Sequence, residues 1–299
     1  MKQIIVISGK GGTGKTIITA SFASLAKNKV MADCDVDAAD LHLLLKPVVK
    51  ERNQFKSGQT AKINKNLCSK CGECVKACHF DAISKDFIID FLSCEGCAVC
   101  SLICPDKAIS MEDNLSGEWF ISETKYGPMV HAKLGIAAEN SGKLVTMVRR
   151  AAKLIAEKEQ KDYCIIDGPP GIGCPVIASL VGVDFALIVT EPTLSGIHDL
   201  KRVLSIAKQN KIKTSVCINK YDLNLENTQK IKDFCKKSKV DMAGDIPFDK
   251  EAVKSLINAV PLVEYDENRE ASIRIKEMWN KIKKTLWQDM ELKKEVVKN

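Results

Sequence analysis

The chain alternates short apolar runs with longer amphipathic stretches. Six of the apolar runs have the length of buried strands, and they occupy residues 3–8, 28–35, 162–168, 184–190, 214–219 and 242–247. Apolar residues recur with helical spacing between several of these runs, at residues 16–27, 142–159 and 195–209. This order predicts an α/β fold with a doubly wound, mostly parallel sheet that helices cover on both faces.

A segment rich in cysteine interrupts the alternation. The polar stretch 50–60 leads into it as a linker, and the segment ends near Ser110. A domain inserted into a loop needs ends that lie close together. We therefore expect a first part of the α/β domain at residues 1–59, an inserted domain at 60–112, and the second part of the α/β domain at 113–299.

The last helical stretch is amphipathic. Lysines lie opposite one apolar face, which is formed by Ile275, Trp279, Ile282, Leu286 and Met290. Helices at a membrane surface and helices docked on a sheet share this pattern. Because Glu277 and Asp289 dilute the positive face, the pattern favours docking, and we do not expect binding to a membrane surface.

Composition narrows the class of protein. The chain has 299 residues, 45% of them hydrophobic, and no apolar run long enough to span a bilayer. Its formal charge of +7 comes from lysines scattered without a basic block, so we expect no nucleic-acid partner. The first residues lack a signal peptide, which predicts a cytoplasmic protein. Thirteen cysteines in a reducing compartment indicate metal binding more than disulfides.

The stretch "SGKGGTGK" follows the first apolar run and has the spacing of a phosphate-binding loop. Lys15 is expected to reach the β and γ phosphates of ATP or GTP, and the Thr16 hydroxyl to bind Mg²⁺. Small residues let the loop wrap its backbone around the phosphates; the loop comprises Gly9, Lys10, Gly11, Gly12, Thr13 and Gly14. Lys10 is one lysine more than the motif requires.

Polar residues at the ends of later strands complete a predicted nucleotide site. Asp33 and Asp35 end the second strand, and Asp167 ends a later one before the glycine-rich "GPPGIG". Carboxylates there can hold Mg²⁺ through water or orient the attacking water, although each aspartate alone could also cap a helix. Asn219 is expected to hydrogen-bond the base, and Pro247 to lie on its ring.

Eight cysteines form two copies of one motif. The spacing C-x2-C-x2-C-x3-C recurs 26 residues later, and Ala82-Ile83 matches Ala108-Ile109 at the same offset. This is the bacterial ferredoxin pattern, in which the fourth cysteine of each run crosses over to the other cluster. It predicts two [4Fe-4S] clusters, one held by Cys68, Cys71, Cys74 and Cys104 and the other by Cys78, Cys94, Cys97 and Cys100.

Zinc is the competing metal for these cysteines. Zinc sites usually combine two C-x2-C pairs, whereas runs of three closely spaced cysteines supply three corners of one cubane, so the spacing favours iron and sulfur. His79 stands where the second copy has Pro105. We interpret this histidine as a loop residue that at most tunes a cluster potential.

The motifs "KGGTGKT", "DCDVD" and "DGPPGIG" resemble those of the deviant Walker ATPases of the MinD, ParA and Mrp group, to which the nitrogenase iron protein is also similar. With its cysteine segment, the whole chain resembles MinD-superfamily P-loop ATPases that carry an inserted ferredoxin domain. The resemblance implies that Lys10 reaches across an ATP-bound homodimer to the partner's phosphates, that Asp35 orients the attacking water, and that Asp33 and Asp167 act on Mg²⁺. The chain departs from the pattern at Asp37 and Asp40, where relatives often carry a small residue and an asparagine. These positions lie in switch I, the segment after the second strand, so the departure concerns that segment and not the nucleotide site.

These features together predict an ATPase, slow without its partner, in which nucleotide-dependent dimerisation gates electron transfer through the two clusters. The redox partner is unidentified. The alternatives are an iron-sulfur assembly or carrier ATPase of the Mrp type and, from another class, a MinD/ParA-like positioning ATPase. A carrier would need a labile cluster, whereas a ferredoxin-type set of eight cysteines holds its clusters firmly.

Cys174 lies seven residues after Asp167. In the nitrogenase iron protein a switch II cysteine at a matching distance ligates a cluster shared across the dimer. That relative supplies two cysteines per subunit, and the corresponding region here, residues 133–145, contains none. Cys174 is therefore a candidate for an extra thiol site, with a redox-sensitive thiol and a buried residue at the start of a helix as the alternatives.

Overall fold

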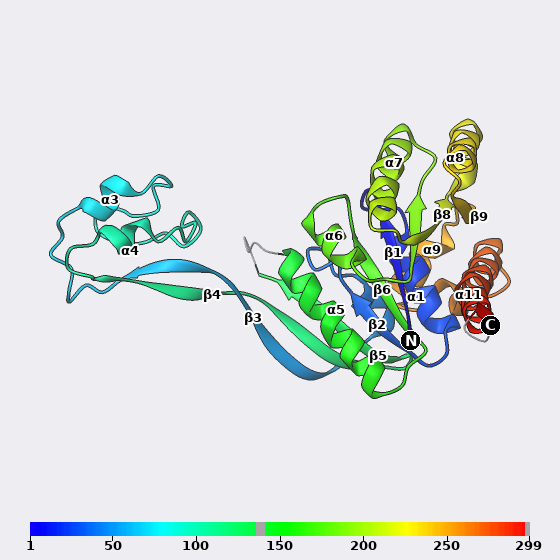
Figure 1. Cartoon of the computed structure of the whole chain (residues 1–299), viewed down its shortest axis with the longest axis horizontal. Helices are drawn as coiled ribbons and strands as arrows, with labels where there is room; N and C mark the ends of the chain where they lie inside the picture. The colour runs from blue at the N-terminus through cyan, green and yellow to red at the C-terminus, as the bar shows by residue number, and fades with distance from the viewer. Residues whose placement is uncertain (136–140, 297–299) are drawn as a thin grey trace. The chain divides into compact units, whose positions relative to one another are not determined.

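The computed structural model describes residues 1–135 and 141–296, with side chains up to Trp287 at the C-terminal end. Its centre is a nine-stranded sheet in the order β3-β4-β5-β2-β6-β1-β7-β8-β9 (Figure 1). The strands are β1 (Lys2–Ser8), β2 (Lys29–Asp33), β3 (Val48–Ile63), β4 (Ile109–Thr124), β5 (Gly127–Leu134), β6 (Tyr163–Pro170), β7 (Phe185–Thr190), β8 (Lys213–Asn219) and β9 (Asp241–Ile246).

The helices fall between these strands along the chain. They are α1 (Lys15–Leu25), α2 (Leu41–Leu45), α3 (Glu73–Ala77), α4 (Val99–Ile103), α5 (Ser141–Lys158), α6 (Cys174–Leu180), α7 (Leu194–Gln209), the 3₁₀ helix η1 (Tyr221–Leu223), α8 (Leu225–Lys237), α9 (Glu251–Ile257), α10 (Leu262–Tyr265) and α11 (Glu270–Val296).

All six predicted strands are confirmed. They form the parallel part of the sheet, in which β1 pairs with β6 and β7, β2 with β6, and β8 with β7 and β9. Residues 4–7 of β1 and residues 185–189 of β7 are fully buried. Parallel strands covered on both faces need apolar side chains on both faces, which explains why these runs do not alternate with polar residues.

The prediction of a polar linker at residues 50–60 was wrong, because this stretch lies within β3. β3 neighbours β4 in the sheet, and β4 neighbours β5 after a two-residue turn at residues 125 and 126, which makes those two strands antiparallel. Most side chains of β3 are exposed. Its strand conformation therefore comes from backbone pairing with a distant segment, which a hydrophobic pattern cannot reveal.

The chain divides into two compact units. The large unit comprises residues 1–52, 119–133 and the chain from 141 onward, and the small unit consists mainly of Asn53–Glu118. β3 and β4 each run from one unit into the other (Figure 1). The small unit extends beyond the expected inserted domain of residues 60–112 at both ends, because it includes parts of β3 and β4.

Within the small unit the two cysteine motifs repeat in backbone conformation. Left-handed residues recur 26 positions apart: Lys70 (φ 62°) and Gly96 (φ 64°), Gly72 (φ 82°) and Ala98 (φ 64°), and Asp81 and Lys107 (both φ 50°). Burial repeats as well, at 2% exposure for Ala82 and Ala108 and at 6% for Ile83 and Ile109. The sequence duplication is therefore a structural duplication, with α3 and α4 as equivalent helices that pack together.

The helix α11 docks on the large unit. Ile275, Trp279, Ile282 and Leu286 are buried, and the Trp279 ring lies 5.0 Å from that of Phe22 on α1. This confirms the predicted docked face for these four residues, while the Met290 side chain lies outside the described residues. Within residues 1–135 and 141–296, no helix combines the length and the apolar character needed to cross a membrane.

Candidate functional site

The predicted phosphate loop connects β1 to α1. Gly14 precedes the helix with φ 84°, and a Cβ there would lie 2.3 Å from Nδ2 of Asn219. Only glycine accommodates both the backbone conformation and this close approach. Asn219 Nδ2 in turn donates to the Thr13 carbonyl at 2.8 Å. The end of β8 therefore holds the loop in shape.

Lys15 lies among the predicted carboxylates. Its Nζ is 3.1 Å from Asp167 Oδ1 and 3.3 Å from Asp35 Oδ2, and Lys15 and Asp167 are both buried. Thr16 Oγ1 donates to Asp167 Oδ2 at 2.8 Å, and Thr19 Oγ1 donates to Asp167 Oδ1 at 3.0 Å. Asp167 on β6 therefore forms one hydrogen-bonded group with Thr16 and Thr19 near the start of α1.

Asp33 lies beside Asp167 on the neighbouring strand, with which it is in register. Its carboxylate accepts from the backbone N–H groups of Asp35 and Leu41, at 3.1 and 3.2 Å. Asp33 thereby fixes the loop that follows β2. The structure brings Asp33, Asp35 and Asp167 together with Lys15 and Thr16, because the carboxyl ends of parallel strands meet at one edge of the sheet.

Burial and neighbouring charges both shift the pKa values of the residues in this group. Burial raises the pKa of Asp33 well above its usual range, and the negative charge of Asp167 raises it further. The pKa of Asp35 is also raised, chiefly by burial. Burial lowers the pKa of Lys15, but Asp167, Asp35 and Asp33 outweigh it and the net pKa is raised. A divalent cation would favour the ionised carboxylates, so the arrangement suits Mg²⁺.

The two residues expected at the base lie at neighbouring strand ends. Asn219 uses its amide for the phosphate loop and for the N–H of Lys220, whose nitrogen is 3.0 Å from Asn219 Oδ1. Its observed partners are therefore protein groups, and its contact with the base stays a prediction. Pro247 follows β9 and lines an open pocket with Asp222 and Phe248.

Lys10 points to the turn between β7 and α7. Its Nζ is 3.3 Å from Glu191 Oε2 and donates to Thr193 Oγ1 at 3.3 Å and to Ser195 Oγ at 3.4 Å. The lysine that the motif does not require is therefore held by groups of its own chain. Its action across a dimer stays a prediction.

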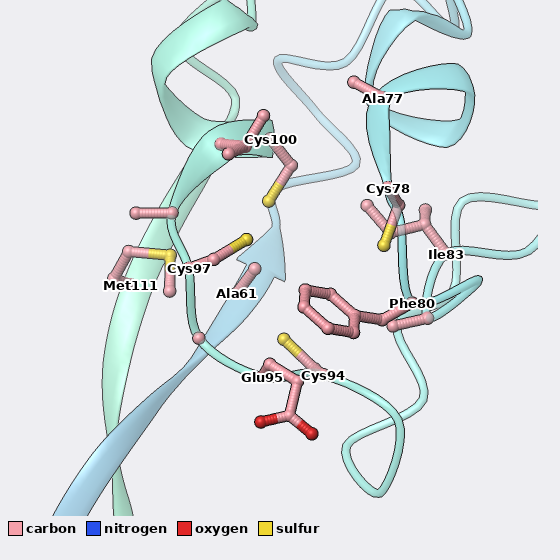
Figure 2. A pocket seen from close by; sticks show the side chains of 14 residues that line it. Ala61, Ala77, Cys78, Phe80, Ile83, Cys94, Glu95, Cys97, Cys100 and Met111 are labelled. Atoms are coloured by element: carbon pink, nitrogen blue, oxygen red, sulfur yellow. The ribbon is translucent and has the colours of Figure 1, made fainter.

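The small unit gathers four of the eight predicted cluster ligands around one pocket. Cys78, Cys94, Cys97 and Cys100 line it, together with Phe80 and Met111. Figure 2 shows the four sulfur atoms directed towards a common space. These are the four cysteines expected to share one cluster. Residues contributed by both copies of the motif meet here because α3 and α4 pack against each other.

The other predicted set belongs to the same duplicated core. Cys74 is buried, and Cys104 packs against the core formed by Ala61, Cys74, Ile83 and Ile109. Cys71 is exposed, and all thirteen cysteines are free thiols. Within the described parts of the chain, no group of three or more His, Cys, Asp or Glu side chains is arranged to hold a metal ion.

Cys174 is the first residue of α6 and is exposed. This excludes the alternative of a buried thiol at the helix start. A Cβ on Gly142, in the first turn of α5, would lie 3.6 Å from Cys174 Cβ, so the thiol stands where α5 and α6 approach each other. A role as a ligand or redox-sensitive thiol stays a prediction.

Sequence reasoning missed several polar groups of this site. Glu191 lies directly after β7, and Lys220 directly after Asn219 at the end of β8. Both could have been found by the rule that located Asp33 and Asp167, since residues just beyond parallel strands meet at one edge. Thr19 gave no such signal, because a threonine inside a helix usually faces solvent or its own backbone.

Comparison with known proteins agrees with this geometry. Residues 4–262 match the family described as the CobQ/CobB/MinD/ParA nucleotide binding domain. An uncharacterized protein of Methanocaldococcus jannaschii is 36% identical over 266 residues, which cover 88% of this chain and 90% of that protein. The cell division ATPase MinD of Pyrococcus furiosus has a similar fold, with a TM-score of 0.58 at 18% identity over 95% of this chain and all of that one.

A further match is confined to a short stretch. Over 68 residues the chain is 37% identical to the pyruvate synthase subunit PorD of Methanothermobacter marburgensis. The stretch covers 22% of this chain and 84% of PorD. It is about as long as the segment that forms most of the small unit.

Proposed function

Because this chain belongs to the CobQ/CobB/MinD/ParA nucleotide-binding family and is a P-loop ATPase of the MinD/ParA type, we propose that it couples ATP binding and hydrolysis to electron transfer through two [4Fe-4S] clusters. One observation carries the proposal. A phosphate loop with its carboxylates and a duplicated eight-cysteine unit occur in one chain, joined by two strands that run from one unit into the other.

The nucleotide chemistry uses residues that are already close together. Lys15 exchanges its contacts with Asp35 and Asp167 for the β and γ phosphates of ATP. Thr16, Asp33 and Asp167 then act on Mg²⁺, directly or through water. The absence of a purely protein-made metal site in the described residues fits this role, since Mg²⁺ usually binds one or two carboxylates plus substrate phosphates and water. Asp35 orients the attacking water.

The cysteines of the small unit fit two cubane clusters better than zinc. A single ion needs its thiolates packed round one point, whereas a cubane takes one thiolate at each of four corners, which leaves the sulfurs farther apart. The sulfurs of Cys78, Cys94, Cys97 and Cys100 surround a shared pocket without forming a single-ion site. Cys68, Cys71, Cys74 and Cys104 would hold the second cluster by the repeat.

Such clusters would supply one-electron transfer, and the protein's part is to hold and gate them. Asp33 ends β2 and Asp167 lies on β6, so the two switch segments follow strands that carry carboxylates of the nucleotide site. β3 follows the first of these segments and runs into the small unit. A conformational change at the phosphates can therefore be transmitted along the backbone through β3 to the clusters. The redox partner supplies or takes the electron.

Hydrolysis depends on an ATP-bound homodimer in which Lys10 reaches the partner's phosphates. A cation delivered across the interface stabilises charge that develops on the transferring phosphoryl group. The extra lysine within the loop and the membership of the MinD/ParA family support this arrangement. The monomer alone is then a slow ATPase.

The test compares the two lysines of the loop. Lys15→Ala is expected to lose nucleotide affinity in the monomer, because the lysine contacts the phosphates directly. Lys10→Ala is expected to retain monomer binding of ATP while losing dimerisation and hydrolysis. Binding is measured by calorimetry and oligomeric state by light scattering. Parental ATPase activity in Lys10→Ala would overturn the trans role.

Iron content tests the clusters independently of ATPase activity. Anaerobically reconstituted protein is expected to hold about eight irons per chain, since each cubane carries four. Cys94→Ser is expected to lose about four of them, and Cys174→Ser none. Zinc in place of iron, or a loss that is the same for both variants, would contradict the assignment.

An iron-sulfur carrier of the Mrp type is the second candidate. The observation that favours it is the exposed thiol of Cys174 at the start of α6, just after the switch that contains Asp167. Iron in excess of eight per chain that is lost in Cys174→Ser, but kept when the cysteines of the small unit are replaced, would support a shared site in the dimer. The docked face of α11 speaks against the third candidate, a positioning ATPase held at a membrane by this helix.

A further inference from the structure

The segment that follows β8 holds the phosphate loop at two points. Asn219 Nδ2 donates to the carbonyl of Thr13 at 2.8 Å, and Lys220 Nζ donates to the carbonyl of Gly12 at 3.4 Å. Lys220 has a left-handed backbone (φ 56°) and directly precedes η1, the short helix that contains Asp222. The position of Asp222 is therefore fixed relative to the loop by its neighbours in the chain.

Asp222 also contacts the segment that follows β9. Its Oδ1 accepts from the N–H of Phe248 at 2.7 Å. Asp222, Pro247 and Phe248 line one open pocket with a volume of about 520 Å³, which is enough for a purine base with its ribose. The carboxylate therefore faces the pocket that contains Pro247, the residue expected to lie on the ring of the base.

The negative charge of Asp222 is available to a ligand in this pocket. Asp249 lines the same pocket, but its two oxygens accept from the guanidinium of Arg269 at 2.6 and 2.8 Å. Asp222 is exposed, and within the part of the chain that the structure describes it makes no ion pair. Each carboxylate oxygen can accept two hydrogen bonds, so Asp222 can keep the N–H of Phe248 and still accept from two further donors.

The two purines differ at the edge that such a carboxylate would meet. Guanine has two adjacent donors there, N1–H and the N2 amino group, whereas adenine has an N1 that only accepts. We propose that Asp222 is a specificity-determining residue that accepts from these two donors of guanine, so that the nucleotide site takes GTP as well as ATP. The phosphate loop and Pro247 meet groups that both nucleotides share, so ATP binds without the two bonds. The inference rests on the nucleotide site of the proposed function and is independent of the clusters.

Calorimetry of the full chain with GDP and with ADP, both in the presence of Mg²⁺, tests the proposal without interference from hydrolysis. The parent is expected to bind GDP at least as tightly as ADP. Asp222→Asn keeps an oxygen for the N–H of Phe248 but replaces the other acceptor by a donor. Its affinity for GDP relative to ADP is expected to fall about tenfold, and by no less than about threefold, because hydrogen bonds to a charged group are among the stronger ones.

Xanthosine diphosphate provides a rescue that a purely structural role would not give. Xanthine has a carbonyl oxygen where guanine has the N2 amino group, so it repels a carboxylate and accepts from an asparagine amide. Asp222→Asn is expected to bind this nucleotide about tenfold more tightly than the parent does. Asp266→Asn is the matched control, since it makes the same exchange at another residue that lines the pocket. It is expected to leave the preference among the three nucleotides within about twofold.

The outcomes separate this inference from the proposed function. A parent that binds ADP more tightly than GDP would overturn the reading of guanine by Asp222, and so would a change of less than threefold in the preference of Asp222→Asn. Equal loss of GDP and ADP in that variant, with no gain for xanthosine diphosphate, would show that Asp222 only holds Phe248 and would overturn it as well. Failure of the parent to bind either GDP or ADP would instead remove the nucleotide site and the proposed function with it.

Discussion

The two units of this chain are held together in different ways. In the large unit, α1, α11 and the parallel strands enclose a continuous core whose members, such as Ile4, Phe22 and Phe185, are fully buried. In the small unit the fully enclosed apolar residues are few, and partly buried cysteines pack against them. A core this small contributes little stability through apolar burial, and small units commonly add disulfides or metal. All thirteen cysteines are free of disulfides, so the proposed clusters are the groups expected to stabilise the small unit.

Removal of iron from the proposed clusters is therefore expected to give the largest difference between the two units. In iron-free protein, hydrogen exchange at the amides of α3 and α4 is expected to speed up by roughly a hundredfold or more, because folding and metal binding are coupled. Exchange in β1 and β6 should stay slow, which makes these strands the internal control. Slow exchange of α3 in the absence of iron would mean that the small unit folds without the proposed clusters.

Two phenylalanines, one in each unit, test the difference in core packing between the large and the small unit. Phe22 is fully buried against Trp279, whereas Phe80 in the small unit is 44% exposed. Phe22→Ala is expected to cost about 3–5 kcal/mol in the free energy of unfolding of the large unit, measured in urea. Phe80→Ala is expected to leave that transition within about 0.5 kcal/mol. Equal losses would show that the two units unfold as one.

The duplication within the small unit gives a second matched pair. Ile83 and Ile109 are equivalent in the repeat and equally buried. Replacement of either by alanine is expected to destabilise the unit by about 2–3 kcal/mol. In iron-loaded protein this would be measured as thermal loss of the absorbance of the proposed clusters at a lower temperature. A much larger effect at Ile109, the first residue of β4, would mean that the strand shared by both units dominates the repeat.

A titratable group inside the large unit gives the smallest expected effect. Burial lowers the pKa of His131 on β5 to about 4, with a further contribution from His42. The unfolded chain therefore binds a proton between pH 6.5 and 4 that the folded one does not, and stability falls as the pH falls through this window. The loss should reach about 2 kcal/mol at pH 5.

His131→Gln is the control for this pH dependence. Glutamine carries no titrating group and can keep a polar contact with Ser122, whose Oγ is 2.9 Å from His131 Nε2. The urea unfolding free energy of the variant is expected to vary less between pH 6.5 and 5 than that of the parent. An unchanged slope would place the pH dependence of the large unit elsewhere.

Most of the correct predictions about the fold came from local sequence patterns. The six parallel strands, the docked face of α11 and the duplicated motif were read correctly, because burial on both faces, helical amphipathicity and repetition each leave a mark in contiguous residues. The linker at 50–60 was misread because β3 takes its conformation from pairing with β4, a segment 46 or more residues away in the chain. Exposed polar side chains gave no sign of it.

The sequence by itself determined the motifs, that is, the phosphate loop, the aspartates at strand ends and the eight cysteines in register, since spacing along a chain is a local property. Only the tertiary structure decided which group faces which. Asn219 contacts the loop backbone, Lys10 pairs with Glu191, and Cys78 joins three cysteines of the other copy around one pocket. These contacts join residues far apart in the chain, and they exist because parallel strands end at one edge of a sheet and duplicated helices pack against each other.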